Sequence, residues 1–107
     1  MAVIRMTEVQ GTVNKRGVLS KPLVDHEHLS IHNLVLKAGE SIPPHSMPVD
    51  VTFYVVAGQG TIRIGETDNS VIPGDIVQCP IETAMSVAAA EDEGLSILNL
   101  KTPSLNS

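Results

Sequence analysis

Apolar residues along the chain fall into short runs, many with alternating spacing, and Gly, Pro, Asn and Asp separate these runs. Such runs are typical of β-strands, because successive side chains of a strand point to opposite faces of its sheet. We expect the strands listed here by residue range: 3–6, 18–24, 29–36, 51–56, 61–64, 76–79, 85–89 and 95–100. The chain is therefore predicted to be all-β, folded as a sandwich or barrel.

In three segments, individual residues affect the expected structure as much as the alternating pattern does. Residues 84–93 are rich in Ala and Glu, which are good helix formers, but the regular spacing of strands on both sides favours a strand at 85–89. Pro22 lacks the N–H that a central strand must donate, so we expect 18–24 to be an edge strand. The Pro43-Pro44 pair predicts a loop that leads past His45 into the buried strand 51–56.

Composition excludes several classes of function. The chain has 107 residues, enough for one domain with its own core, and no room for a second domain. Its 12 acidic and 7 basic residues give a net charge of −5 without any basic run, so we expect no nucleic-acid partner. No apolar run approaches the roughly 20 residues needed to span a bilayer, so no membrane partner is expected.

The cellular location follows from two further features. The N-terminus lacks a basic stretch followed by a long apolar stretch, so it does not resemble a secretory signal, and we expect a cytoplasmic protein. Cys79 is the only cysteine, which excludes an intrachain disulfide and agrees with a reducing compartment. Its side chain can also be read as a small buried hydrophobic group.

Three of the four histidines lie close together at His26, His28 and His32. Residues two apart in a strand share a face, so His26 and His28 could act together as metal ligands. No third soft or acidic ligand is fixed nearby, and an H-E-H segment in an acidic chain is more often an exposed turn. We therefore interpret this segment as a solvated loop.

The segment from residue 39 to residue 60 contains a spacing that resembles the first motif of the cupin family, G-x5-H-x-H-x3-E-x6-G. Gly39, His45, Met47, Val51 and Gly58 occupy its five named positions without a gap. The glycines and the first histidine match the motif, whereas the second histidine and the glutamate are replaced by Met47 and Val51.

A second spacing resembles the other cupin motif, G-x5-P-x-G-x2-H-x3-N. Gly74, Pro80, Glu82, Met85 and Ala89 stand at its named positions, and only the first two match the motif. Together the two spacings run from residue 39 to residue 89. The resemblance implies a single-domain cupin of the RmlC-like type, a double-stranded β-helix or jelly-roll β-barrel.

The resemblance also implies where a metal would be held. The family's ligand positions fall on His45, Met47, Val51 and Met85, of which only the histidine offers a nitrogen or oxygen donor. A site for iron, manganese, nickel or zinc needs three or more such donors, so we expect the usual metal site to be degenerate and no cofactor to be bound.

The residues still predict a pocket. Strand parity places His45, Met47, Val51 and Phe53 on one interior face, with Met85 approaching from a neighbouring strand. The preferred reading is a small-ligand-binding or non-catalytic barrel in which the methionines fill space.

Two alternatives remain open. The first is a copper site, in which His45, Met47 and Met85, with Cys79 as a further donor, hold Cu(I), because soft sulfur donors suit that ion. The second is a metal-independent, isomerase-type enzyme with His45 as base. Its acid partner would be Tyr54, Asp50 or Glu82, although parity turns Tyr54 and Asp50 away from the pocket. Whether the chain is an enzyme stays open, with the missing ligands favouring a binding role.

The expected organisation has three parts. Residues 1–24 form an N-terminal strand segment that contacts a second copy in a dimer, residues 25–103 form the cupin barrel, and residues 104–107 form a tail. Small cupins commonly form dimers, and the edge strand with Pro22 gives a separate reason to expect strand pairing across a two-fold axis. We therefore predict a homodimer.

Overall fold

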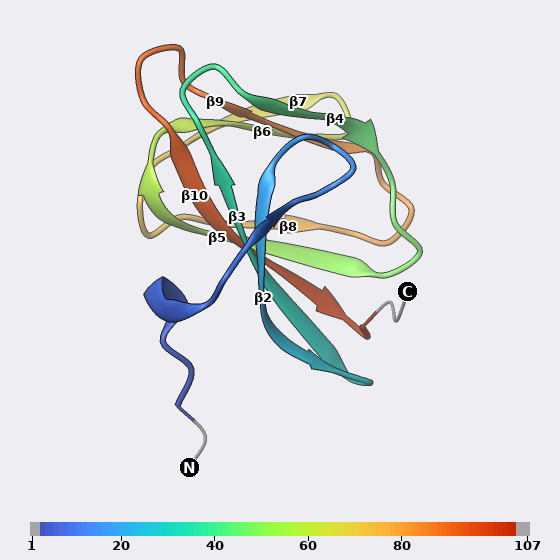
Figure 1. Ribbon diagram of the computed structural model, residues 1–107. Helices are drawn as coiled ribbons and strands as arrows, with labels where there is room; N and C mark the ends of the chain where they lie inside the picture. The colour runs from blue at the N-terminus through green and yellow to red at the C-terminus, as the bar shows by residue number, and fades with distance from the viewer. Residues whose placement is uncertain (1–2, 105–107) are drawn as a thin grey trace.

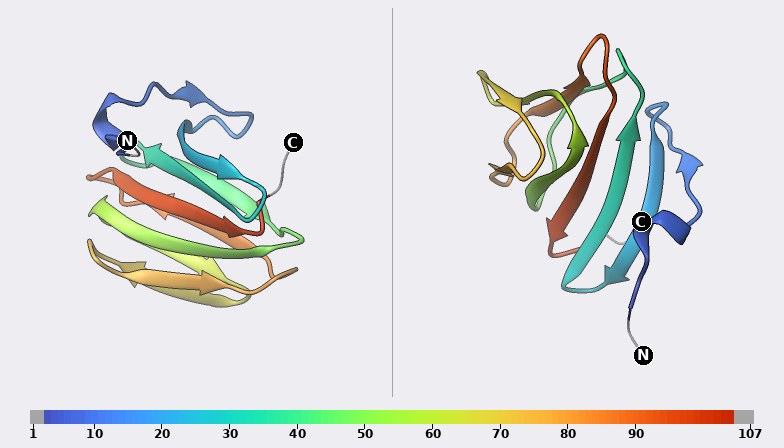
Figure 2. Two further views of the ribbon diagram at one scale, coloured as in Figure 1. Left: turned by 90° about the horizontal axis from the view of Figure 1, so that it is seen from below. Right: turned by 90° about the vertical axis from the view of Figure 1, so that its left-hand side faces the viewer.

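The computed structural model describes residues 3–104, which form two antiparallel sheets that face each other (Figures 1 and 2). The larger sheet has six strands in the order β1-β2-β3-β10-β5-β8, and the smaller has four in the order β4-β9-β6-β7. In chain order the elements are the 3-10 helix η1 (Met6–Glu8), β1 (Thr12–Val13), β2 (Leu19–His26), β3 (Leu29–Leu36), β4 (Ser41–His45), β5 (Asp50–Gly58), β6 (Gly60–Ile64), β7 (Thr67–Val71), β8 (Ile76–Cys79), β9 (Met85–Ala89) and β10 (Leu95–Thr102).

The core lies between the two sheets and is built by alternation along the strands. In β5, Val51, Phe53 and Val55 are each at most 2% exposed, whereas Tyr54 between them points outward. Leu95 and Ile97 of β10 are likewise buried at two-residue spacing. With one phenylalanine in the chain, aliphatic side chains make up most of this core. The prediction of an all-β jelly-roll barrel is confirmed.

Most predicted strands are present, and three have the expected bounds: β3, β8 and β9. The strand at residues 85–89 is thus confirmed against its helical propensity, because Met85, Val87 and Ala89 alternate into the core. The predicted strand at residues 3–6 is wrong. Residues 3–5 have no regular structure and η1 follows them, since Val3 and Ile4 are exposed and do not pack against a sheet.

The predicted loop through the proline pair is also wrong, because residues 41–45 form strand β4. β4 is the outermost strand of the smaller sheet and pairs only with β9 among the described strands. An edge strand tolerates proline, since one side of it needs no N–H donors. The register shifts between Ile42 and His45, where Pro43 and Pro44 interrupt the pairing.

β2, which contains Pro22, was predicted to be the edge strand of its sheet, but β1 lies outside it in the strand order. Its outer neighbour β1 pairs only with Leu19 and Ser20, and a β-bulge follows Pro22 in the pairing with β3. The expected division between an N-terminal segment and the barrel, after residue 24, falls inside β2. Residues 105–107 of the expected tail lie outside the described part of the chain. The homodimer stays a prediction.

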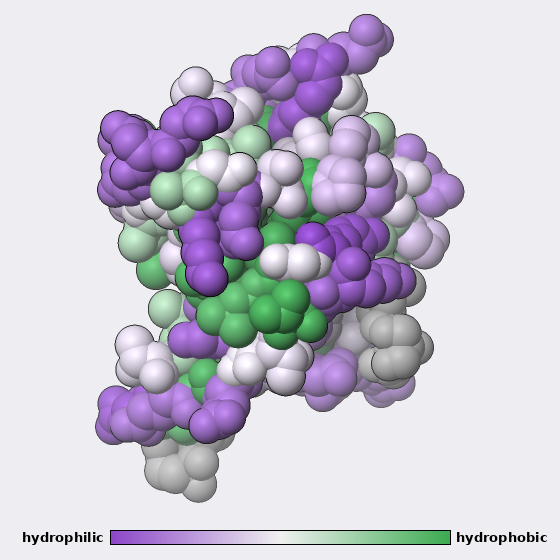
Figure 3. Space-filling model, turned by 45° about the horizontal axis from the view of Figure 1, so that its top comes forward, coloured by the Kyte–Doolittle hydropathy of each residue, from purple (hydrophilic) through white to green (hydrophobic). Residues whose placement is uncertain are grey.

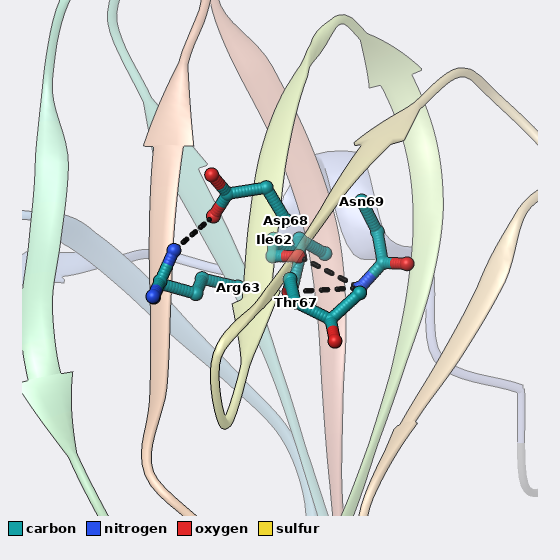
Figure 4. A network of polar contacts seen from close by, with 5 residues as sticks. All are labelled: Ile62, Arg63, Thr67, Asp68 and Asn69. Carbon is teal, nitrogen blue, oxygen red and sulfur yellow. Dashed lines mark hydrogen bonds and ion pairs between the residues drawn. The ribbon is translucent and has the colours of Figure 1, made fainter.

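A tight hairpin joins β6 to β7, with residues 65–66 between the two strands. The side-chain amide of Asn69 donates to the carbonyl oxygens of Ile62, at 3.1 Å, and Thr67, at 3.4 Å (Figure 4). The Arg63 guanidinium donates to Asp68 Oδ1 at 2.9 Å across the same pair of strands. These contacts link the two strands of the hairpin.

The last glycine of the first motif, Gly58, closes β5, and its position has a steric basis. Its φ is +87°, and a Cβ atom there would lie 1.9 Å from the carbonyl oxygen of Gly94. In the second motif Glu82 occupies a glycine position and keeps a φ of +64°, the one positive φ of a non-glycine residue within residues 3–104.

On the face shown in Figure 3, apolar surface gathers in a central patch that hydrophilic side chains surround. Within residues 3–104, no helix is long and apolar enough to cross a membrane.

Candidate small-molecule site between the two sheets

A cavity of about 140 Å³ opens between the two sheets at the end where β2 and β4 lie. Its inner wall is apolar and comes from both sheets, with Leu34 on β3, Phe53 on β5, Ile42 on β4 and Val87 on β9. Met47, in the segment between β4 and β5, completes this apolar wall. The cavity is therefore formed by the core itself.

The rest of the lining is polar and cationic. It comprises Asn14, Arg16, Ser20, His32, His45, Asn99 and Lys101, contributed by the β1–β2 loop and by β2, β3, β4 and β10. The lining contains no aspartate or glutamate. A cavity with a positive polar rim and an apolar floor suits an amphipathic small molecule.

His32 and Asn99 form a polar pair at the centre of this lining. They are register partners in the pairing of β3 with β10, so their side chains project side by side from the inner face of the larger sheet. His32 Nδ1 and Asn99 Oδ1 are both buried and have no hydrogen-bond partner within residues 3–104. A buried polar atom without a partner is destabilising, so a hydrogen bond to each of these atoms would stabilise the protein.

The tautomer of His45 follows from its own hydrogen bond. His45 Nδ1 lies 3.1 Å from the carbonyl oxygen of Pro43, which can only accept, so Nδ1 carries the hydrogen. In the neutral ring Nε2 therefore keeps its lone pair. Burial lowers the pKa of His45, and the positive charges of Arg16 and Lys101 lower it further, whereas the Pro43 hydrogen bond opposes them.

Arg16 and Lys101 are the two permanent cations of the lining. Asn14 shapes the loop that carries Arg16, because its Oδ1 accepts hydrogen bonds from the backbone N–H groups of Arg16, at 2.9 Å, and Val18, at 3.1 Å. Val18 is buried and anchors this loop on the core. Burial lowers the pKa of Lys101, and the positive charges of Arg16 and Lys15 lower it further.

Of the predicted pocket residues, the structure places His45, Met47 and Phe53 on the cavity. Val51 and Met85 are buried, at 1% and 2% exposure, but they pack in the core outside the lining. Met85 is nevertheless the register partner of His45 in the pairing of β4 with β9. The interior parity predicted for these side chains thus agrees with their burial.

The donors at the family's metal positions do not fit the metal that the motif implies. Val51 offers no donor atom, and Met47 and Met85 offer only thioether sulfur. Within residues 3–104, no three His, Cys, Asp or Glu side chains are grouped so that they could hold a metal ion. The copper hypothesis depends on methionine sulfur and stays a prediction.

Cys79, offered as a further copper donor, lies away from this cavity. It is 2% exposed, and its Sγ donates to the carbonyl oxygen of Thr83 at 3.4 Å. Burial raises the pKa of its thiol, and the charge of Asp50 raises it further. Both effects disfavour the thiolate that a metal site would need.

The other residues considered from the sequence are on the surface. His26 and His28 are exposed as expected for a solvated turn, with their rings in an edge-to-face contact at 6.2 Å. Tyr54 and Asp50 point away from the pocket, as parity predicted, and Glu82 is exposed as well. None of these three lines the cavity, so none can serve there as an acid partner to His45.

The sequence reasoning missed several of the polar lining residues, namely Asn14, Arg16, His32, Asn99 and Lys101. A signal existed for two of them, because Asn99 and Lys101 continue the two-residue spacing of the buried Leu95 and Ile97 along β10. Two polar residues at interior parity indicate a site within the barrel.

The two-sheet barrel and its interior cavity define a jelly-roll protein with a site between its sheets. A family model described as cupin domain matches residues 33–101. This match covers more than half of the chain, and the chain belongs to the cupin family.

Individual relatives agree with this assignment. The chain is 28% identical to legumin type B from Vicia faba over 99 residues, which cover 86% of this chain but only 20% to 30% of the legumin sequences. Among solved structures, KdgF from Halomonas sp. has a TM-score of 0.89 at 20% identity, with 99% of this chain and 96% of that chain covered. An RmlC-like cupin from Shewanella frigidimarina has a TM-score of 0.84 at 14% identity, with 92% and 86% covered. Structural likeness at these identities shows the shared fold alone.

Proposed function

We propose that this chain is a small-molecule-binding barrel that holds an organic ligand in the cavity between its sheets, without a metal ion. The observation that carries the proposal is the buried pair of unpartnered polar atoms, His32 Nδ1 and Asn99 Oδ1, in a preformed cavity. An apolar cavity with a few convergent polar groups is the usual form of a ligand site.

The size of the cavity limits the ligand. A volume of about 140 Å³ is close to that of an engineered protein cavity, about 150 Å³, that binds benzene. A molecule with a six-membered ring, or one end of a longer molecule, therefore fits between the sheets. The apolar wall formed by Leu34, Phe53 and Val87 would contact its carbon atoms.

The proposal is tested by titrating the protein with phenol, a neutral probe of this size, and following backbone amide resonances by NMR. We expect shifts at Leu34, Phe53 and Val87, and at least about tenfold weaker binding when Met47→Trp fills the cavity. Met6→Trp, outside the lining, is the matched control and should bind phenol normally. Absence of shifts at those three residues at millimolar phenol would contradict the proposal.

A second candidate function is metal-independent proton transfer by His45, which the free Nε2 of this ring favours. If His45 removes a proton from carbon beside a carbonyl group, the protein should exchange that proton for deuterium in D2O. Proton NMR of small keto compounds would detect this exchange, and His45→Gln should abolish it while phenol still binds. Exchange that persists in His45→Gln would exclude this role.

A further inference from the structure

The charge of the cavity is opposite to the charge of the whole chain. The chain carries a net charge of −5, yet the cavity lining contains Arg16 and Lys101 and no carboxylate. A solvent-exposed pair of cations would be screened by water and salt. Here both side chains are only partly exposed, so their electrostatic effect on a bound molecule is larger.

These cations lack a compensating partner in the cavity. The ion pairs within residues 3–104 are His28 with Glu27 and Arg63 with Asp68, and neither involves Arg16 or Lys101. Burial and the positive charge of Arg16 both disfavour the protonated form of Lys101 and so lower its pKa. A bound anion would offset both effects.

The unpartnered polar atoms of His32 and Asn99 indicate a second feature of the ligand, in addition to its negative charge. Asn99 and Lys101 are two residues apart on β10, so their side chains share the inner face, and His32 lies beside Asn99 in the neighbouring strand. Asn99 Oδ1 can accept a hydrogen bond, and His32 Nδ1 can donate one in the tautomer that carries its hydrogen there. A hydroxyl group both donates and accepts, so one hydroxyl placed between the two atoms would satisfy both.

Building on the proposed function, we propose that the cavity binds a small hydroxy acid. Its carboxylate pairs with Arg16 and Lys101, and its hydroxyl bonds to His32 and Asn99. The carbon skeleton faces the apolar wall. The same groups could hold the hydroxy-acid end of a larger molecule that extends through the open mouth of the cavity.

The test compares four probes by NMR titration: lactate, its neutral amide lactamide, propionate and inorganic phosphate. Lactate and lactamide have nearly the same shape and differ in charge, whereas propionate retains the charge and lacks the hydroxyl. We expect lactate to bind at least about tenfold more tightly than lactamide, the usual size of a charge-assisted contact. Propionate should bind about threefold to tenfold more weakly than lactate.

Variants assign the effect to particular residues. Lys101→Met should weaken lactate binding by about tenfold and leave lactamide binding within about threefold. Lys37→Met makes the same charge change at an exposed lysine outside the lining and should leave both affinities unchanged. If Lys101→Met does not fold, Arg16→Met in the β1–β2 loop makes the same test.

The outcomes separate this proposal from the proposed function. Lactamide binding as tightly as lactate, or phosphate binding more tightly than lactate, would overturn the hydroxy-acid assignment. In either case phenol binding would still support a small-molecule cavity. If phenol binds but neither lactate nor lactamide shifts the cavity resonances, the hydroxy-acid proposal alone fails. If phenol does not bind either, both proposals fail.

Discussion

Asn99 and His32 lie opposite each other in neighbouring strands, and each leaves one buried polar atom without a hydrogen-bond partner in the described part of the chain. A second buried asparagine, Asn33, shows the contrast. It is 1% exposed, and its amide donates to Ser96 Oγ at 3.0 Å and to the carbonyl oxygen of Ile97 at 2.9 Å. Asn33 thus stabilises the sheet, whereas the pair in the cavity matches the bound ligand that we propose.

The first prediction follows from this contrast. Asn99→Leu removes an unpartnered buried group and should raise the free energy of unfolding by about 1 kcal/mol, while it weakens lactate binding. The same substitution at Asn33 removes satisfied hydrogen bonds and should lower that free energy by about 2 kcal/mol. Urea denaturation measures both values. Equal losses of stability in the two variants would show that Asn99 is a structural residue.

The second prediction concerns pH. Burial lowers the pKa of His32 below its ordinary value of about 6.5, with Lys101 adding to the effect and Asp25 opposing it. Burial lowers the pKa of His45 in the same way. As pH falls below about 6.5, the unfolded chain binds more protons than the folded chain, so the contribution of these rings to stability is present above that pH and lost below it.

Urea denaturation between about pH 7 and about pH 5, in buffers without carboxylates, measures this loss as a decreasing free energy of unfolding. His32→Gln removes one of the groups and should make the decrease smaller. His28→Gln, which changes an exposed histidine outside the cavity lining, is the matched control. A pH dependence that His32→Gln does not change would contradict the assignment of the effect to His32.

The third prediction tests why the glycine at the end of the first motif is needed. Gly58→Ala should lower the free energy of unfolding by about 3 kcal/mol or more, because its Cβ would overlap the Gly94 carbonyl oxygen. Gly39→Ala has a similar positive φ, +79°, but nothing lies within 4 Å of its Cβ, so it should lose only about 1 kcal/mol. Thermal and urea denaturation should therefore rank the two variants clearly.

The fold was predictable wherever burial alternates along a strand. Residues 85–89 form a strand despite the helical propensity of their alanines. The reason is that Met85, Val87 and Ala89 are buried in the core at two-residue spacing, which a strand provides. The secondary-structure prediction failed at residues 41–45, where the position of the segment within the sheet determines its conformation. Pro43 and Pro44 normally indicate a loop, and only their place on the edge strand β4 makes a strand possible there.

The site was predictable in part. His45, Met47 and Phe53 follow from motif spacing and strand parity, which are local properties of the sequence. Lys101 follows the same parity along β10, although no motif position marks it. Arg16 reaches the cavity from a loop whose position depends on how the β1–β2 segment folds over the barrel, and no local pattern encodes that position.

The fourth prediction uses Glu82, which keeps a φ of +64° at a glycine position of the second motif. A positive φ destabilises an L-residue by about 1 to 2 kcal/mol, and glycine avoids this cost. Glycine also has more conformational freedom in the unfolded chain, which offsets part of the gain in stability. Glu82→Gly should therefore raise the free energy of unfolding by about 0.5 to 1 kcal/mol. Glu91→Gly, at an exposed turn without a positive φ, should lower it. A destabilised Glu82→Gly variant would show that this side chain makes a favourable contribution.

The last prediction concerns metals. Three of the four family ligand positions carry Met47, Val51 and Met85, and the positive charges of Arg16 and Lys101 in the lining disfavour a cation. Protein purified without an affinity tag should therefore contain no stoichiometric iron, manganese, nickel or zinc by elemental analysis.

An anaerobic titration with Cu(I) examines the copper hypothesis separately, because thioether sulfur can bind that ion without any of the missing oxygen and nitrogen donors. We expect binding weaker than micromolar, since His45 and Met47 face the cationic cavity whereas Met85 is packed in the core. Tighter binding that Met85→Leu abolishes, with the fold retained, would instead establish a soft-metal site at the register pair of His45 and Met85. It would also show that the barrel can rearrange to expose the Met85 sulfur beside the His45 ring.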